Sequence, residues 1–599
     1  MTRTILKPNK TYSYPDMVLL SLKTSPLHTI LFAARQITDA LIPTITIFVT
    51  AYFIDTAIAI FNGYAALPDI YLPIALIFGI MAYNMLMNSI MDLINANRVI
   101  LYRKRLVPEM ANYRASLAYR YIEDPKSHDL IFRVFPYIED RVWNLFTQVL
   151  QIVSLIVFVL GIVITLFTQV WWIAITMVLT SIPIMYIATK AGKERYQADK
   201  DMTEIDRIQW NLSWILIDRE NVEERAVYGY SNDINDRYNE KFEYARNYRL
   251  KITIKNTIKQ KLGGIITSLY AIGAIVALLP QTYSGIISIG MFIALIGAVI
   301  SLSQRLSWGV NSLVFEMTRN SEWLKDLTQF MALEMQSGAT DAPALMDFKK
   351  IEFKNVKFTY PGTDKTVLNG VSFTIEKGRH YSFVGENGAG KTTITKLITG
   401  LYNNYEGDIL VDNVNLRDIH HSKLKGLTSV VFQDFARYSI TLYDNIAMGD
   451  IQNHENRKKV EEAVDLVGLS EAVKNLKHGL DTPLGKVMED GVDLSGGQWQ
   501  RTAMARSVIN PAPLKILDEP TAALDPVAES TVYKNFEKIT KGETTIFISH
   551  RLGSTKLADT IFVLSDGKIA EQGSHTELMQ KNGIYNEMFT TQAQWYVEE

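Results

Sequence analysis

A glycine-rich stretch in the second half of the chain has the composition and spacing of a loop that binds phosphate groups. It consists of Gly385, Glu386, Asn387, Gly388, Ala389, Gly390, Lys391, Thr392 and Thr393, which fit the pattern G-x-x-x-x-G-K-[ST]. The flanking sequence predicts a buried strand over 380–384 and a helix over 393–399. Such a loop turns N–H groups toward phosphate oxygens, while the lysine adds positive charge and the Thr392 hydroxyl reaches Mg²⁺. The pattern therefore predicts a site for a nucleoside triphosphate with Mg²⁺.

An acidic pair follows a second predicted strand. Residues 514–517 are mostly apolar and lead into Asp518 and Glu519, and Asp518 lies 127 residues after Lys391. An aspartate at a strand end holds Mg²⁺ through water, and the glutamate after it is placed to polarise an attacking water. Alone, such a pair usually marks only a strand end, but beside a phosphate loop it predicts hydrolysis.

A third motif lies between these two. Leu494 is followed by Ser495, Gly496, Gly497 and Gln498 at the start of a predicted helix, which makes a second small anion nest. A glycine-rich turn before a helix explains the glycines but not the ordered set of three motifs. In this order the motifs resemble those of the ATP-binding cassette (ABC) transporters, and the resemblance covers essentially the whole chain. It implies that two cassettes enclose two ATP molecules, with each LSGGQ signature closing on the phosphate loop of the other cassette.

The resemblance assigns roles to four more residues, whose sequence contexts are FTYPG, VVFQD, AALD and IFISHR. It implies that Tyr360 stacks on adenine, Gln433 reaches Mg²⁺ and the attacking water, Asp525 communicates across the dimer, and His550 holds the γ-phosphate and orients Glu519. Without the family, a tyrosine or a histidine at the end of a β-rich run is more often structural. One departure is Lys515, which stands where the family has an apolar residue, and it requires an edge strand or a snorkelling side chain.

The first half of the chain supplies a membrane part for this cassette. Residues 36–97, 142–189 and 262–304 contain no Lys or Arg, although charged residues are 21% of the whole chain. The charged residues within these three windows are Asp39, Asp55, Asp69 and Asp92. About 20 apolar residues cross a bilayer, so each window holds two spans with a short turn between them. The six predicted spans cover residues 31–61, 72–93, 145–167, 171–188, 262–279 and 286–302.

The loops between the windows predict the orientation. Residues 98–141 carry nine Lys and Arg residues and residues 190–261 carry fifteen, whereas the three short turns carry none. By the positive-inside rule, the long loops, both termini and the cassette face the cytoplasm. The fold class predicted is an all-α six-helix transmembrane domain followed by an α/β P-loop NTPase cassette. Its segments are an interfacial segment over 1–27, the membrane domain over 28–335, a linker over 336–350 and the cassette over 351–599.

The two long cytoplasmic loops are predicted to be mainly helical, as extensions of the membrane helices. Residues 199–214 and 233–253 mix apolar and charged residues at helical spacing. The resemblance implies that each loop ends in a short helix seated on a cassette, and position suggests 123–133 and 220–230. Without the family, each segment is better interpreted as a solvated charged helix.

The resemblance implies an ATP-driven exporter half-transporter in the bacterial inner membrane. The cassette sequences are most similar to exporters of lantibiotics and related peptides, so we expect a peptide cargo. A multidrug or lipid exporter, or an ATP-gated channel or sensor, remains the alternative. Since all cassette motifs are intact, a homodimer is favoured over a heterodimer. Intramembrane polar residues tend to face a cavity or a partner helix, and the cargo-site candidates are Asp39, Asn84, Asn88 and Asp92.

Composition excludes other classes of function. The net charge of −2 argues against a general nucleic-acid binder, which would carry a basic excess. The chain has no cysteine, which excludes disulfides, thiolate metal sites and an appended cysteine-peptidase domain. A leader peptide on the cargo would therefore be cut by another protein.

Overall fold

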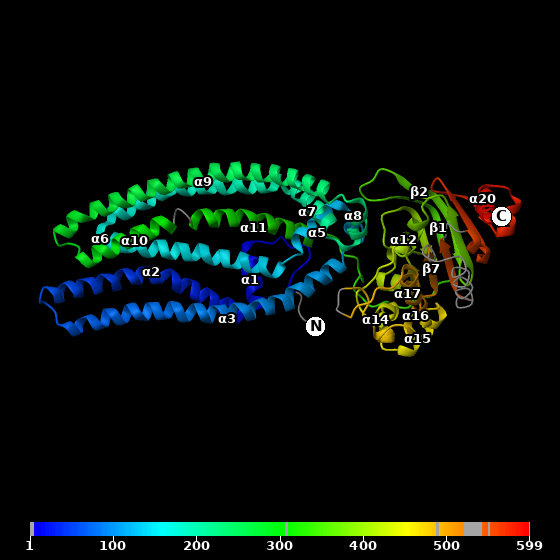
Figure 1. Ribbon diagram of the computed structural model, residues 1–599, viewed down its shortest axis with the longest axis horizontal. Helices are drawn as coiled ribbons and strands as arrows, with labels where there is room; N and C mark the ends of the chain where they lie inside the picture. Colours follow the sequence, from blue (N-terminus) through cyan, green and yellow to red (C-terminus); the bar gives the residue numbers. More distant parts are fainter. Residues whose placement is uncertain (1–4, 306–308, 487–489, 520–541, 549–551, 598–599) are drawn as a thin grey trace. The chain divides into compact units, whose positions relative to one another are not determined.

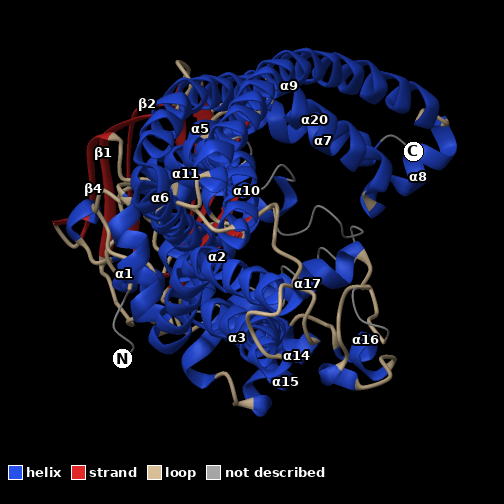
Figure 2. Ribbon diagram, turned by 90° about the vertical axis from the view of Figure 1, so that its left-hand side faces the viewer, coloured by secondary structure: helices blue, strands red, loops and turns tan. Residues whose placement is uncertain are grey.

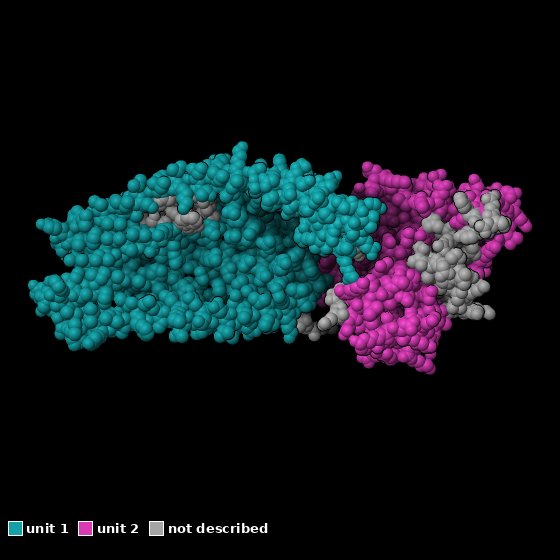
Figure 3. All heavy atoms as spheres, viewed as in Figure 1, with its two compact units in different colours: residues 1–111, 130–332 teal, residues 112–129, 333–599 magenta. Residues whose placement is uncertain are grey.

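The computed structural model describes residues 5–305, 309–486, 490–519, 542–548 and 552–597. The chain forms two compact units, drawn in teal and magenta in Figure 3. Unit 1 comprises Met1–Ala111 and Leu130–Ala332, and unit 2 comprises Asn112–Asp129 and Leu333–Glu599. A segment of the first long loop thus belongs to the same compact unit as the cassette, far from it in sequence.

Unit 1 is built from helices, several of which run side by side over much of their length (Figure 1). Its principal helices are α1 (Tyr14–Thr24), α2 (Pro26–Phe61), α3 (Tyr71–Ala115), α6 (Ile138–Asp201), α7 (Thr203–Ile217), α8 (Val222–Tyr228), α9 (Ser231–Tyr283), α10 (Ile289–Gln304) and α11 (Val310–Met331). Helix α1 coincides with the segment predicted to lie at the membrane interface. The helices α3 and α9 are much longer than a bilayer requires, because their charged ends continue past the apolar part.

The predicted count of six spans is not confirmed. Within the described residues, three stretches are long and apolar enough to cross a membrane: Pro26–Phe61, Leu67–Ala115 and Ile138–Ile173. Two further apolar helices, Ser268–Tyr283 and Ile289–Leu302, are shorter. The third and fourth predicted spans fall within α6, whose backbone leaves helical geometry at Val170, with φ −146° and ψ 83°. Two helices therefore meet at a kink at Val170, which lies at the turn that the sequence predicts between these two spans.

Small residues bring the helices of unit 1 close together. A Cβ atom on Gly290 of α10 would lie 2.3 Å from the carbonyl oxygen of Ala51 on α2, so only glycine fits there. The buried core between these helices is rich in alanine, including Ala40, Ala271 and Ala298. Between apolar helices, close backbone approach through small residues supplies the packing energy.

The charged helical segments of unit 1 follow the predicted helical pattern with one correction. The predicted helix over 199–214 is interrupted at Met202, where α6 ends and α7 begins. Arg249 of α9 holds this junction, because its guanidinium pairs with Asp199 at 3.3 Å and with Asp206 at 2.5 Å. Residues 233–253 lie within α9, as the spacing of their charges predicts.

The cassette contains two sheets, whose strands are red in Figure 2. The four-stranded antiparallel sheet has the order β2-β1-β4-β5, and the six-stranded sheet has the order β10-β9-β3-β8-β7-β6. Their bounds are β1 (Lys350–Thr359), β2 (Thr366–Glu376), β3 (His380–Gly385), β4 (Glu406–Val411), β5 (Val414–Asn415), β6 (Thr428–Val431), β7 (Leu514–Asp518), β8 (Thr544–Ile548), β9 (Thr560–Ser565) and β10 (Lys568–Gly573). Strand β10 is antiparallel to β9, and the other pairs of the six-stranded sheet are parallel.

The topology brings the phosphate loop and the acidic pair together. Strands β3 and β7 both flank β8 in parallel, so their carboxyl ends lie at the same edge of the sheet. The loop after β3 and the carboxylates after β7 therefore share a site although 127 residues separate Lys391 from Asp518. The remaining cassette helices of the described chain are α12 (Lys391–Ile398), α13 (His421–Leu427), α14 (Leu442–Ala447), α15 (Arg457–Leu466), α16 (Ser470–Lys474), α17 (Gly496–Ile509), α19 (His575–Gln580) and α20 (Ile584–Val597).

The two interpretations offered for Lys515 are now separated. Strand β7 lies between β8 and β6, so the edge-strand interpretation is wrong. The side chain is 3% exposed, and its ammonium donates hydrogen bonds to the backbone carbonyls of Ser507 and Asn510 at the end of α17. The lysine snorkels inside the protein to the negative end of a helix dipole.

Candidate functional site

The phosphate loop has the backbone geometry that its glycines predict. Gly385, Gly388 and Gly390 have φ values of +149°, +83° and +104°, which side chains with a Cβ rarely adopt. A Cβ on Gly385 would also lie 2.3 Å from the carbonyl oxygen of Leu564 on the adjacent strand. The loop leads directly into α12, so its N–H groups and the helix N-terminus face the same point.

Lys391 is folded back over this loop. Its ammonium donates to the carbonyl oxygens of Gly385 at 2.8 Å and of Glu386 at 2.9 Å. Burial lowers the pKa of Lys391, while the carboxylates of Glu519 and Asp518 act in the opposite direction. The buried ammonium is held only by uncharged carbonyl oxygens, so a phosphate anion bound beside it would stabilise its positive charge.

Asp518 has the environment of a metal ligand. It is fully buried, and neither carboxylate oxygen has a hydrogen-bond partner within the described residues. Burial raises the pKa of Asp518 to about 6, and the neighbouring Thr392 hydroxyl opposes that rise. Buried carboxylate oxygens without partners are costly, and a divalent cation with oxygen ligands removes that cost. These two residues therefore fit a Mg²⁺ ion.

Glu519 is held in an unusual backbone conformation beside this carboxylate. Its φ of +50° lies in the left-handed region, which costs a non-glycine residue free energy and often marks a functional site. Its backbone N–H donates to the carbonyl of Ile548 at 2.9 Å, and its own carbonyl accepts from Gln500 Nε2 at 3.5 Å. The sheet and the signature helix α17 thus both fix the residue predicted to be the general base.

The signature motif forms the start of α17. Ser495 is the N-cap, and its hydroxyl accepts a hydrogen bond from the Gln498 N–H at 3.3 Å. In return, the Gln498 side-chain oxygen accepts from the Ser495 N–H at 2.9 Å, which completes a capping box. The helix N-terminus lies at the surface of this chain, where it can meet an anion from outside.

The predicted adenine-stacking residue lies beside the phosphate loop. The Tyr360 hydroxyl is 2.9 Å from the Thr393 hydroxyl, and its ring is partly exposed. Phe358 and Tyr402 meet this ring edge to face, at centroid distances of 4.9 and 5.6 Å. Gln433 is exposed after β6. Asp525 and His550 lie outside the described residues, so their roles stay predictions.

The polar residues proposed for a cargo site in the membrane unit are partly engaged with one another. Arg35 pairs with Asp39 at 2.8 Å and donates to the side-chain oxygen of Asn88 at 3.2 Å. One further nitrogen of Arg35 and one oxygen of Asp39 have no hydrogen-bond partner within the described residues. Asn84 is partly buried and Asp92 is exposed. Sequence analysis missed Arg35, since it lies one residue before the first window without Lys or Arg.

Sequence analysis also missed a groove in unit 1. It is an open groove of about 670 Å³ whose lining residues come from α2, α6, residues 304–305 and residues 309–316; most of these residues are polar, but much of the lining surface is apolar. The lining includes Gln36, Gln151, Gln304, Arg305, Ser312 and Glu316. The glutamines are the signal that could have identified it, because uncharged polar residues inside apolar helices are costly unless they serve packing or binding.

Comparisons with known proteins agree with the fold and the site. The family model described as "ABC transporter" matches residues 368–522. The subtilin transport ATP-binding protein SpaT of Bacillus subtilis is 28% identical over 92% of this chain and 90% of its own length. The nisin transport ATP-binding protein NisT of Lactococcus lactis is 28% identical over 71% of each chain. An ATP-dependent lipid A-core flippase of Pseudomonas aeruginosa is 40% identical over 39% of this chain and 38% of its own.

A solved structure has the same fold. A bacterial Atm1-family ABC exporter with ATP bound superposes with a TM-score of 0.78, at 22% sequence identity, over 94% of this chain and 98% of the other. The similarity therefore extends through both units.

Proposed function

Since this chain is an ABC transporter of the exporter half-transporter type, which couples ATP hydrolysis to export, we propose that it carries a peptide out of the cytoplasm. The main support for a peptide cargo is the length of chain over which this protein resembles a peptide transport protein. The match to the subtilin transport protein spans 92% of this chain, and so includes the membrane unit. A lipid A-core flippase of Photorhabdus laumondii is also 28% identical but over 72% of this chain, so the flippase similarity reaches into the membrane unit over a shorter length. Cassettes are shared by exporters of many cargoes, so the longer match weighs more for the cargo.

The polar side chains of the groove in unit 1 favour a peptide cargo, and its apolar surface can contact apolar side chains of that peptide. Its lining combines three glutamine amides with Arg305 and Glu316, so it offers hydrogen-bond donors, acceptors and both signs of charge. A peptide backbone presents alternating N–H and C=O groups that pair with amides, whereas acyl chains leave buried amides unpaired. We therefore place the cargo contact at this groove, with Asp39 and Asn88 as neighbouring polar groups.

The cassette residues perform the hydrolysis as follows. Lys391 and the loop N–H groups bind the phosphates, Tyr360 packs against the adenine, and Glu519 accepts a proton from the attacking water. Asp518, Thr392 and Gln433 would hold Mg²⁺, which neutralises phosphate charge when bound. Asp525 and His550 complete the site in the roles assigned to them by motif.

We propose that the working unit is a homodimer in the bacterial inner membrane, with six spans in each chain and the cassettes in the cytoplasm. The signature helix α17 presents its N-terminus at the surface, where it can close on the phosphate loop of a second copy. Unit 1 exposes apolar residues on its charged cytoplasmic helices, which favours a partner there. Among them are Trp210 and Trp214, whose stacked rings are 62% and 50% exposed.

Transport by inverted vesicles tests the function. We expect vesicles that contain the wild-type protein to accumulate a fluorescent peptide against its gradient when ATP is added. The Glu519→Gln variant serves as the inactive control, and Glu471→Gln, a change at an exposed acid of α16, serves as the matched active control. ATP-dependent leakage down the gradient would instead support a gated channel, and accumulation of a fluorescent lipid alone would support lipid export.

A further inference from the structure

Lys396 of α12 lies one helical turn beyond the phosphate loop, in a box of aromatic rings. Its ammonium is 5.4 Å from the ring centroid of Tyr360, 5.7 Å from that of Tyr119 and 6.0 Å from that of Tyr402. Distances below about 6 Å allow a cation–π attraction. Two of these rings belong to the cassette, whereas Tyr119 belongs to the segment Asn112–Asp129 that precedes it by more than 200 residues.

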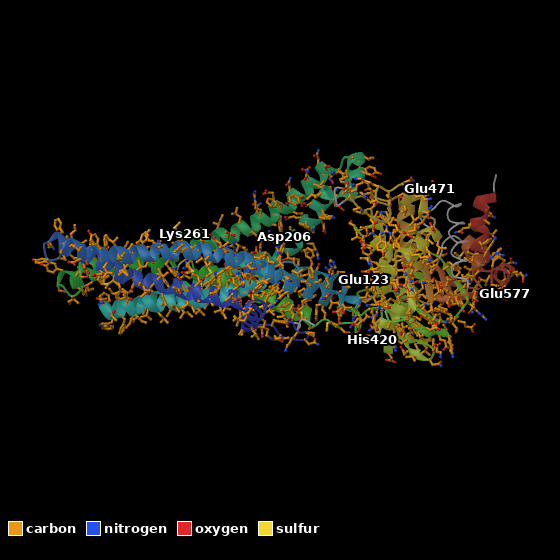
Figure 4. All side chains as sticks on the ribbon, turned by 90° about the horizontal axis from the view of Figure 1, so that it is seen from below. Glu123, Asp206, Lys261, His420, Glu471 and Glu577 are labelled. Carbon is orange, nitrogen blue, oxygen red and sulfur yellow. The ribbon has the colours of Figure 1, made fainter. Side chains whose placement is uncertain are left out.

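One carboxylate holds this box together. Glu123, at the end of the short helix α4 (Arg120–Glu123), accepts a hydrogen bond from the Lys396 ammonium at 2.8 Å. It also accepts from the hydroxyls of Tyr119, at 2.9 Å, and of Tyr402. Glu123 is labelled in Figure 4. A single side chain of the first loop therefore bonds to a cation and two phenols.

The other side of the box is the proposed adenine site. Tyr360 meets the Tyr402 ring edge to face at 5.6 Å, and its hydroxyl reaches Thr393, the last residue of the phosphate-loop motif. Tyr402 is 1% exposed, so its ring has little freedom to move independently. The orientation of the Tyr360 ring thus depends on Tyr402 and Lys396, and both depend on Glu123.

The loop segment is itself anchored on its cassette side. The Ala118 N–H donates to the Glu334 carbonyl at 3.0 Å, and the Gln336 N–H donates to the Ser116 carbonyl at 2.8 Å. Arg120 forms an ion pair with Glu334. The segment begins in the last turn of α3, whose preceding residues belong to unit 1, so continuous backbone connects Glu123 to unit 1.

We propose that Glu123 and Lys396 are positioning residues that orient Tyr360 for the nucleobase and so couple nucleobase binding to the first cytoplasmic loop of the same chain. This inference rests on the proposed function of Tyr360 as the adenine-stacking residue. Coupling of this kind is reciprocal: if the loop position changes the affinity for ATP, ATP binding changes the loop position. The phosphates of ATP contact the loop after β3, whereas the base contacts Tyr360, which is linked to the first cytoplasmic loop by Lys396 and Glu123.

The first test separates the base from the phosphates. We expect Glu123→Gln and Lys396→Met to raise the KM for ATP about three- to tenfold with little change in kcat, because stacking on the base is weakened. Inorganic tripolyphosphate, which has no base, should inhibit the ATPase of these variants and of the wild type at the same concentration. Lys396→Arg should restore the wild-type KM, since arginine keeps the ion pair and the cation–π contact. Lys423→Met, at an exposed lysine of α13, is the matched control.

The second test follows the loop directly. The chain has no cysteine, so Lys126→Cys, at an exposed position three residues after Glu123, can carry a single environment-sensitive fluorophore. Emission should change when ATP is added to the full-length protein and should not change with tripolyphosphate. Glu123→Gln should remove the response to ATP.

The outcomes of these tests distinguish failure of the proposed coupling from failure of the proposed exporter function. An unchanged KM in Glu123→Gln and Lys396→Met, with ATPase activity intact, would overturn the coupling and leave the exporter assignment standing. Equal losses for ATP and tripolyphosphate would show that the cluster only stabilises the cassette, which also overturns it. Absence of ATPase activity in the folded wild-type protein would instead overturn the proposed function.

Discussion

The two units handle buried charge in opposite ways. In the membrane unit, Arg35 faces Asp39 and Asn88, and the Asp55 carboxylate accepts from the Ser288 hydroxyl at 2.5 Å and from the Gly290 N–H at 2.7 Å. In the cassette, Lys391 rests on uncharged carbonyls and the Asp518 oxygens have no partner within the described residues. In the membrane unit, most of these charged atoms have hydrogen-bond or ion-pair partners within the chain. In the cassette, the Asp518 carboxylate needs a bound cation, and the Lys391 ammonium needs a bound anion, to balance its charge. At the chemical site the Asp518 carboxylate has no hydrogen-bond partner on either oxygen within the described residues, whereas in the membrane unit the charged groups of Arg35, Asp39 and Asp55 each have at least one partner.

The largest effect should come from a substitution at the ATP site of the cassette. We expect Glu519→Gln to lower ATPase turnover by at least about 100-fold, because loss of a general base typically costs 10²- to 10⁴-fold. ATP binding should be retained, since the amide keeps the shape of the side chain. Turnover and equilibrium binding of a fluorescent ATP analogue check both parts. Turnover near the wild-type rate would refute the assignment of Glu519 as the base.

Lys391→Ala should weaken the binding of ATP, which precedes hydrolysis. The change removes the cation at the phosphate site, and we expect the affinity for ATP to fall by at least about tenfold, in line with the strength of charge-assisted hydrogen bonds. Isothermal titration with ATP measures the loss. If Lys391 served only to stabilise the loop, thermal stability without nucleotide would fall while affinity held.

Substitution of a paired charge in the membrane unit should lower the stability of the fold and leave ATP hydrolysis intact. Asp39→Asn leaves the buried Arg35 without its counter-charge, and we expect unfolding to become easier by about 2 kcal/mol. The double variant Arg35→Met/Asp39→Asn should recover most of that loss, because no charge is then left unpaired. Thermal unfolding in detergent measures each variant. A cargo contact would behave differently, with cargo-stimulated ATPase activity reduced and stability unchanged.

Lys515 sharpens the comparison inside the cassette, because it is a buried cation held only by carbonyls. Burial lowers the pKa of Lys515 to about 8 from 10.5. Between these values the unfolded chain binds more protons than the folded one, so the lysine's contribution to stability rises with pH over this range. We expect the gap in unfolding temperature between wild type and Lys515→Met to shift in favour of wild type from pH 7.5 to pH 10. A gap independent of pH would show that the pKa of Lys515 is the same in the folded and unfolded chain, which would contradict the effect of burial.

Sequence predicted the cassette site closely for a physical reason. Phosphate binding requires a glycine loop of fixed φ values, a cation and a strand-end carboxylate, and these requirements leave few alternatives at Gly385, Lys391 and Asp518. The resemblance predicts that the segment beginning at Glu123 lies on a cassette, but it does not predict the partners Lys396 and Tyr402. These residues are more than 200 positions from Glu123 and stand in no motif.

The membrane unit was predictable in part. The absence of charge over 142–189 predicts two membrane helices with a turn between them, and the backbone leaves helical geometry at Val170, between the two predicted spans. Polar residues in these helices are ambiguous, since a carboxylate that caps a helix and one that binds cargo have the same sequence signal. Asp55 was left unassigned for that reason, and its two hydrogen bonds at the start of α10 identify it as a cap.

The smallest effect tests that cap. Asp55→Ala removes the acceptor for the Ser288 hydroxyl and the Gly290 N–H, and loss of such a cap typically costs about 1 kcal/mol. We expect a small drop in the unfolding temperature with ATPase turnover unchanged, and Asp92→Ala, at an exposed acid of α3, should show no drop. Asp55→Asn should retain part of the stability, because its amide oxygen still accepts from the Gly290 N–H. If Asp55→Ala instead abolished transport at full stability, intramembrane carboxylates of this unit would belong with the charges of the cassette that need a bound ligand, and the division between paired and functional charge would not hold.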